Sequence, residues 1–128
     1  MRLFLVRHAH AAPGDPDSLR PLSSEGREQA RALGERLAAA SPDAVVTSPL
    51  LRARETADAI ARAAGVQVRS DERLAPGAAA DDVAAAVAGA GETVVVVGHQ
   101  PDCSEIAAAL GAGERRFAPA GFAELELP

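Results

Sequence analysis

The sequence predicts an α/β fold, a three-layer α/β/α sandwich around a mostly parallel sheet with one antiparallel edge strand. Short apolar runs alternate along the chain with stretches of helical periodicity, which is typical of strands and helices packed in layers. The runs 3–6 and 94–97 contain no polar residue, as expected of strands that are buried on both faces. We expect the helices between parallel strands to form right-handed crossovers.

The first strand is predicted over residues 3–6, and a loop follows at 11–23, where prolines and a glycine interrupt any regular pattern. Because this loop begins close to the end of the strand, we expect it to face a substrate. A helix is predicted to begin near Ser23 or Ser24 and to end before Pro42.

A second strand is predicted over residues 43–47. Ser48 and Pro49 follow it, and they suit the N-cap and the first position of a second helix. One face of that helix is expected to contain Ala53, Thr56, Ala57, Ile60 and Ala64. Gly65 is expected to end the helix as a C-cap.

A short strand is predicted over residues 66–69, followed by a loop over 71–80. Asp81 or Asp82 is expected to cap a third helix. The apolar side of this helix is predicted to consist of Val83, Ala84, Val87 and Ala88.

The run 94–97 is predicted to be a central parallel strand, and a fourth helix should begin at Pro101 and Asp102. Residues 122–127 alternate apolar and acidic side chains, which predicts an edge strand with one face in solvent.

Length and charge restrict the classes of function. A chain of 128 residues suits one domain, 1–128, and the single cysteine, Cys103, has no partner for an internal disulfide. A formal net charge of −5 disfavours binding to nucleic acid or to an anionic membrane, and no apolar segment is long enough to span a bilayer. We therefore expect a cytoplasmic protein with no nucleic-acid or membrane partner.

Two of the predicted strands end next to a histidine. Arg7 and His8 follow the first strand, and His99 follows the run 94–97 after one glycine. Because the carboxyl ends of parallel strands meet at one crevice, we expect the two imidazoles to lie in one site.

Three motifs occur in the same order as in a known family: RHA at 7–9, SPLLRARETA at 48–57 and VGHQPD at 97–102. With them, the chain resembles the histidine phosphatase superfamily, the phosphoglycerate-mutase-like group. The run RPLSSEG at 20–26 and the short chain make it most similar to the SixA-type phosphohistidine phosphatases. The resemblance covers nearly the whole chain.

The resemblance implies a phosphatase in which His8 is the nucleophile and becomes phosphorylated. It implies that Arg7 and Arg52 hold the phosphoryl oxygens and that His99 donates a further hydrogen bond, which we expect it to do as a protonated ring. Transferring phosphoryl groups carry negative charge on three oxygens, so cationic donors around them fit this chemistry. No metal or cofactor is expected to take part.

Several other residues near the motifs have two interpretations. Arg20 either contacts a phosphate oxygen or holds its loop in place. We expect Arg54 to be solvated, Thr56 to pack with its hydroxyl within the helix, and Cys103 to fill space in the core. His10 either supports the electrostatics of the site or is exposed, and we favour exposure.

The chain also departs from the family pattern. Ala9 replaces the signature glycine, and His10 replaces a common acidic residue. Larger members place a general-acid glutamate two residues after a leucine, whereas the corresponding run here is Leu74-Ala75-Pro76. The carboxylates that remain as candidates for the general acid lie in loops or at a helix start: Asp15, Asp17, Glu72 and Asp81.

A missing general acid favours a phosphohistidine substrate, because a protonated imidazole leaves more readily than an alkoxide. We therefore expect hydrolysis of a phosphohistidine-bearing protein. The alternatives are a phosphomonoesterase for a phosphorylated small molecule, with a loop carboxylate as acid, and a phosphate-binding module without turnover.

Overall fold

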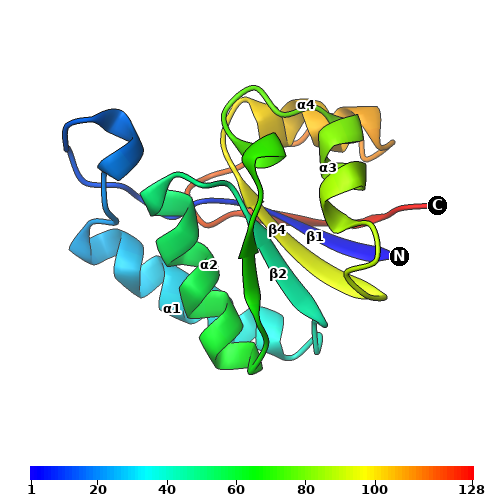
Figure 1. Cartoon of the computed structure of the whole chain (residues 1–128), viewed down its shortest axis with the longest axis horizontal. Coiled ribbons are helices and arrows are strands. Elements are labelled where there is room, and N and C mark those ends of the chain that lie inside the picture. The colour runs from blue at the N-terminus through cyan, green and yellow to red at the C-terminus, as the bar shows by residue number, and fades with distance from the viewer.

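A five-stranded sheet forms the centre of the computed structural model, which describes all residues, 1–128 (Figure 1). Its strands are β1 (Arg2–Arg7), β2 (Ala44–Thr47), β3 (Val68–Ser70), β4 (Thr93–Gly98) and β5 (Phe122–Glu126). The order across the sheet is β3-β2-β4-β1-β5, and only β5 runs antiparallel to its neighbour. The predicted α/β fold with an antiparallel edge strand is confirmed.

Two helices cover each face of the sheet (Figure 1). The helices are α1 (Ser24–Ala38) and α2 (Leu51–Ala64) on one face, and α3 (Ala80–Val87) and α4 (Asp102–Ala109) on the other. Two short 3₁₀ turns, η1 (Asp17–Leu19) and η2 (Glu72–Leu74), lie in segments that the sequence predicts as loops. No helix has the length and apolar character needed to cross a membrane.

Alternate residues of β1 supply both halves of the core. Leu3 and Leu5 pack on the side of α3 and α4, whereas Phe4 and Val6 pack on the side of α1 and α2. All four side chains are buried, because β1 lies inside the sheet with helices on both faces. The absence of polar alternation in this run therefore reflects its position in the sheet.

The predicted start of α1 is confirmed, and it explains the glycine that follows. The Ser23 hydroxyl accepts a hydrogen bond from the Gly26 amide at 3.0 Å, which makes Ser23 the N-cap. A Cβ atom on Gly26 would overlap the carbonyl oxygen of His10. Only glycine therefore lets α1 approach the segment after β1 this closely.

Two predicted helix starts are wrong. The second helix begins at Leu51, because the Ser48 hydroxyl bonds the His99 ring and the Leu50 amide in a turn before the helix. The third begins at Ala80 with Ala79 as N-cap, ahead of both predicted aspartates. The Asp82 carboxylate instead accepts a hydrogen bond from the Ala79 amide at 2.9 Å.

Two further details of the second half also differ from the prediction. Strand β3 begins at Val68, two residues later than expected. The buried residues of α3 include Ala86, whereas Ala84 and the C-cap residue Ala88 are exposed, because the face that meets the core is not the predicted one. The Gly65 C-cap is confirmed by its left-handed backbone, with φ of 71°.

Candidate active site

The carboxyl ends of β1 and β4 lie side by side and bring two histidines together. Arg7 pairs with Gly98 in the sheet, and the His8 amide donates a hydrogen bond to the Gly98 carbonyl at 3.0 Å. The ring centroids of His8 and His99 are 5.2 Å apart, with an angle of 58° between the rings. The expectation that the two strand ends place both imidazoles in one location is confirmed.

The tautomer of His8 is determined by its own chain neighbour. Nδ1 of His8 lies 2.7 Å from the carbonyl oxygen of Ala9, which can only accept, so Nδ1 carries the proton. In the neutral ring Nε2 then keeps its lone pair. Burial lowers the pKa of His8, and the charges of Arg52, Arg7 and Arg20 lower it further, against the hydrogen bond to Ala9. A neutral ring with a free Nε2 is the form that can act as a nucleophile.

His99 is buried, with 4% of its surface exposed, and its Nε2 lies 2.7 Å from the Ser48 hydroxyl. Burial, the His8 ring and the Arg52 charge together lower the pKa of His99 to about 4. The ring is therefore neutral near neutral pH, and the expectation that it is protonated is wrong. Its Nδ1 atom is buried and has no hydrogen-bond partner.

Two guanidinium groups reach this location from different elements. Arg7, the last residue of β1, donates from NH1 to the Phe117 carbonyl at 2.9 Å, while its buried Nε has no partner. Arg52, in the first turn of α2, is only 7% exposed. Arg54 points into solvent, as expected, because it lies two positions further round the helix.

A carboxylate lies against the Arg52 guanidinium. Asp17 of η1 accepts hydrogen bonds from Arg52 through its backbone oxygen, at 2.9 Å, and through Oδ2, at 3.1 Å. Its Oδ1 lies 3.2 Å from NH1 of Arg20, whose Nε donates to the Ala12 carbonyl. The contacts of Arg20 thus hold the loop, which is one of its two predicted roles.

The four candidate carboxylates for a general acid lie in different surroundings. Asp17 contacts Arg52, and its hydrogen bonds with Arg20 and Arg52 lower its pKa, so it is ionised near neutral pH and has no proton to donate. Asp15, Glu72 and Asp81 are exposed and form no hydrogen bond or ion pair with the histidines or with Arg7 and Arg52.

The segment after His8 is tied to α2 by Thr56, a contact that the sequence does not reveal. The Thr56 hydroxyl donates to the Arg52 carbonyl at 2.8 Å and accepts from the Ala9 amide at 3.0 Å. A threonine one turn after Arg52 was expected only to pack within the helix. Its hydroxyl does bond within the helix, as expected, and it also couples the helix that contains Arg52 to the segment that contains His8.

Ser48 is the second residue whose role sequence reasoning missed. Its position directly after β2, at the same edge of the sheet as the two histidines, is the signal that would have identified it. The predictions for His10 and Cys103 hold: His10 is exposed, and Cys103 is buried among core residues. Burial raises the pKa of the Cys103 thiol to about 12, which leaves it unreactive.

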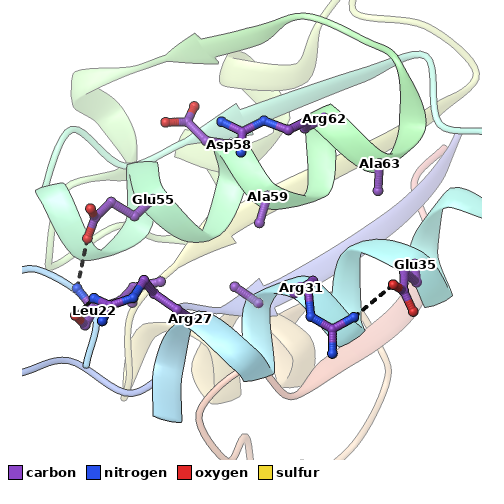
Figure 2. Close-up of a pocket in the computed structure, with 10 residues that line it drawn as sticks. Leu22, Arg27, Arg31, Glu35, Glu55, Asp58, Ala59, Arg62 and Ala63 are labelled. Carbon is purple, nitrogen blue, oxygen red and sulfur yellow. Dashed lines mark hydrogen bonds and ion pairs between the residues drawn. The ribbon is translucent and has the colours of Figure 1, made fainter. Parts of the chain in front are cut away.

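A groove of about 450 Å³ between α1 and α2 lies apart from the histidines (Figure 2). At one end Glu55 of α2 accepts a hydrogen bond from the Leu22 amide at 2.8 Å, and at the other Arg31 bonds Glu35 along α1 (Figure 2). The contact from Glu55 fixes the end of the 11–23 loop, which contains Asp17 and Arg20.

Comparisons with known proteins identify the family of this chain. Residues 3–76 match the family model described as histidine phosphatase superfamily (branch 1). The chain belongs to the histidine phosphatase superfamily. It is therefore a phosphatase of this superfamily, as the resemblance of its motifs implied.

Two relatives show how far the similarity to other members of the superfamily extends. An uncharacterized protein of Picosynechococcus is 34% identical over 124 residues, with 89% of this chain and 75% of that protein covered. A candidate phosphoglycerate mutase, GpmB, of Serratia proteamaculans is 38% identical over 81 residues. That match covers 58% of this chain, which spans only 37% of the length of the Serratia protein.

Among solved structures, the protein histidine phosphatase SixA complexed with tungstate superposes with a TM-score of 0.88. The two sequences are 25% identical, and the match covers 99% of this chain and 88% of SixA. Within the superfamily, the architecture of this chain is thus that of a SixA-type protein over nearly its whole length.

Proposed function

We propose that this superfamily member is a metal-independent phosphohistidine phosphatase, with His8 as the nucleophile. The observation that carries the proposal is the hydrogen bond from His8 Nδ1 to the Ala9 carbonyl. It leaves a neutral ring with the lone pair on Nε2, and the positive charges of Arg7 and Arg52 lie close enough to influence that ring.

In the first step, the Nε2 lone pair of His8 forms a bond to phosphorus while the bond to the leaving group breaks. The electron pair of the broken bond stays on the leaving atom, and the phosphoryl group becomes attached to His8. Because Nδ1 keeps its proton in the bond to Ala9, the product on His8 is a phosphorylated imidazolium. Its positive charge makes that ring a good leaving group for the next step.

In the second step, the oxygen of a water molecule attacks phosphorus, and the bonding pair returns to Nε2 of His8. The water loses a proton to solvent, inorganic phosphate departs, and the neutral ring is restored. Arg7 and Arg52 counter the charge on the phosphoryl oxygens in both steps.

Two buried nitrogens without hydrogen-bond partners support the proposal that an anion binds at this site. Nε of Arg7 and Nδ1 of His99 are the only buried side-chain polar atoms that lack a hydrogen bond. Orphaned buried groups are rare in folded proteins, and both occur on residues of the proposed site. A phosphoryl oxygen would provide an acceptor for the Arg7 donor. The tungstate of the similar SixA structure is an oxyanion of comparable shape.

The proposed substrate is a phosphohistidine on a partner protein, with a small phosphorylated molecule as the alternative. Pro76 stands where larger members have an acid, and Asp17 is held ionised by Arg20 and Arg52. An imidazole that is already protonated leaves phosphorus without a proton from the enzyme, whereas an alkoxide needs one.

The test compares rates of the wild-type protein on a phosphohistidine-bearing domain and on a panel of phosphate monoesters, with excess chelator in every reaction. We expect a clear preference for the phosphohistidine domain. A preference for monoesters would contradict the substrate assignment and favour a small-molecule phosphomonoesterase. An absence of turnover on every substrate would indicate a phosphate-binding module.

A further inference from the structure

The 3₁₀ turn η1 places a negative charge against Arg52 of the proposed site. The side chain of Asp17 is 65% exposed, yet each of its carboxylate oxygens contacts a guanidinium, Oδ1 that of Arg20 and Oδ2 that of Arg52. Its charge also reaches the ring of His99, where it opposes the lowering of the histidine pKa. In Figure 1 the turn lies beside the amino end of α2.

This carboxylate is a disadvantage for a ligand whose only charge is the phosphoryl group. A phosphoryl-binding site needs positive charge because the phosphoryl oxygens are negative. The Asp17 carboxylate, which forms an ion pair with Arg52, weakens the positive potential at short range. Its hydrogen bonds to Arg20 and Arg52 lower the pKa of Asp17, so the negative charge persists near neutral pH. A phosphate monoester would therefore be repelled by Asp17.

A phosphorylated imidazole differs from a monoester at one atom. Phosphorus occupies one ring nitrogen, and the other nitrogen can take up a proton, which makes the ring a cation with an N–H donor. An ionised carboxylate has about four acceptor positions on its two oxygens, and the two guanidinium contacts of Asp17 use only two of them. The remaining positions can accept a hydrogen bond from the imidazolium N–H.

We propose that Asp17 is a specificity residue that binds the imidazolium N–H of a phosphohistidine and discriminates against phosphate monoesters. This inference rests on the proposed function and assigns its substrate preference to one side chain. The protonated ring leaves as neutral imidazole when the phosphorus–nitrogen pair returns to it, so no proton moves to or from Asp17. The carboxylate captures the reactive form of the substrate, and its effect should therefore lie in KM rather than in kcat.

The test uses Asp17→Asn with two small substrates, phosphoimidazole and 4-nitrophenyl phosphate, and measures kcat and KM for both. Asparagine keeps the shape of the side chain and the backbone oxygen that holds Arg52, and it removes the charge. We expect KM for phosphoimidazole to rise about 10-fold, the difference between a charged and a neutral hydrogen bond. KM for 4-nitrophenyl phosphate should stay the same or fall.

The matched control is Asp58→Asn, which removes the same charge from an exposed position on α2 beside the separate groove. This control should leave both KM values unchanged. Asp17→Glu, which restores the charge, should recover at least part of the preference for phosphoimidazole.

Other outcomes of the Asp17→Asn experiment would overturn the inference. An equal loss on both substrates would mean that Asp17 only positions Arg52, and an equal gain would mean that it only blocks Arg52. Unchanged KM values would show that Asp17 has no part in recognition. Failure of the proposed function is separable, because it would appear in the wild-type protein as hydrolysis of 4-nitrophenyl phosphate with none of phosphoimidazole.

Discussion

Nδ1 of His8 lies 2.7 Å from the carbonyl oxygen of Ala9, the next residue in the chain. This short contact determines which ring nitrogen carries the proton, and it keeps that proton in place if Nε2 becomes phosphorylated. Ala9 is in turn held by the bond between its amide and the Thr56 hydroxyl. The orientation of the proposed nucleophile thus depends on backbone groups that the family signature does not specify.

Replacement of His8 by alanine is expected to lower turnover by at least roughly 1,000-fold, because the proposed reaction passes through a bond to Nε2. Wild-type protein quenched during turnover of a ³²P-labelled substrate should contain a phosphorylated species that is labile in acid and stable in alkali. His8→Ala should contain none.

His10→Gln is the control for that experiment. His10 lies two residues from His8, its side chain is 49% exposed, and its ring nitrogen bonds the Ser23 hydroxyl. Turnover of this variant should stay within about twofold of wild type, because exposed positions away from the reacting atoms have small effects. A labelled intermediate that survives in His8→Ala would mean that another residue is the nucleophile.

Arg52 and Arg54 form a second matched pair on one helix. Arg52→Lys loses the planar fork that contacts the backbone oxygen and Oδ2 of Asp17, and replaces it with a point charge. We expect kcat/KM to fall roughly 100-fold, near the lower end of the range for loss of a preorganised donor. Arg54→Lys, on the exposed face of α2, should have no measurable effect. Equal effects of the two changes would exclude a special role for Arg52.

The sequence was sufficient to predict the sheet, its antiparallel edge strand and the meeting of His8 with His99, because these follow from apolar runs and from where parallel strands end. The start of α2 was mispredicted for a physical reason. A serine before a proline is a good local N-cap, but the Ser48 hydroxyl instead contacts His99, which lies far away in the sequence. The tertiary contact with His99 therefore outweighs the local preference of Ser48 for the N-cap position.

The protonation state of His99 also could not be predicted from the sequence. The expectation of a positive ring followed from its proposed role as a donor to phosphate. Burial of the side chain and the nearby Arg52 charge depend on the packing of α2 and α4 around β4, which no local pattern encodes. The contact between Asp17 and Arg52 was hidden in the same way, because it joins a loop to a helix that follows much later in the chain.

Thr56→Val tests the link between α2 and the segment after His8. Valine matches threonine in shape but cannot accept the hydrogen bond from the buried Ala9 amide. The unsatisfied amide should lower the free energy of unfolding by about 1–3 kcal/mol, measured by denaturant titration. Thr56→Ser, which keeps the hydroxyl, should recover most of the loss that arises from the hydrogen bond. A Thr56→Val variant as stable as the wild type would show that the hydrogen bond to the Ala9 amide contributes nothing measurable to stability.

The buried His99 allows us to predict in which direction the free energy of unfolding changes with pH. Its pKa is about 4 in the folded protein and about 6.5 in an unfolded chain, so between these values the unfolded state binds more protons. The stability that the neutral His99 ring contributes is therefore fully present above about pH 6.5 and is lost as the pH falls toward 4. The two pKa values correspond to a total of about 3 kcal/mol, and the lowered pKa of His8 acts in the same direction.

Denaturant unfolding of the wild type and of His99→Asn between about pH 7.5 and 4.5 measures this contribution. The variant lacks the titrating ring, so its free energy of unfolding should decline less over that interval, even though its stability at pH 7.5 is lower. Carboxylates that are paired with arginine, such as Asp17, are common to both proteins and cancel in the difference. Identical pH profiles for the two proteins would show that the pKa of His99 is the same in the folded and unfolded states. A wild type that gains stability relative to the variant as the pH falls would show that the His99 ring is charged in the fold.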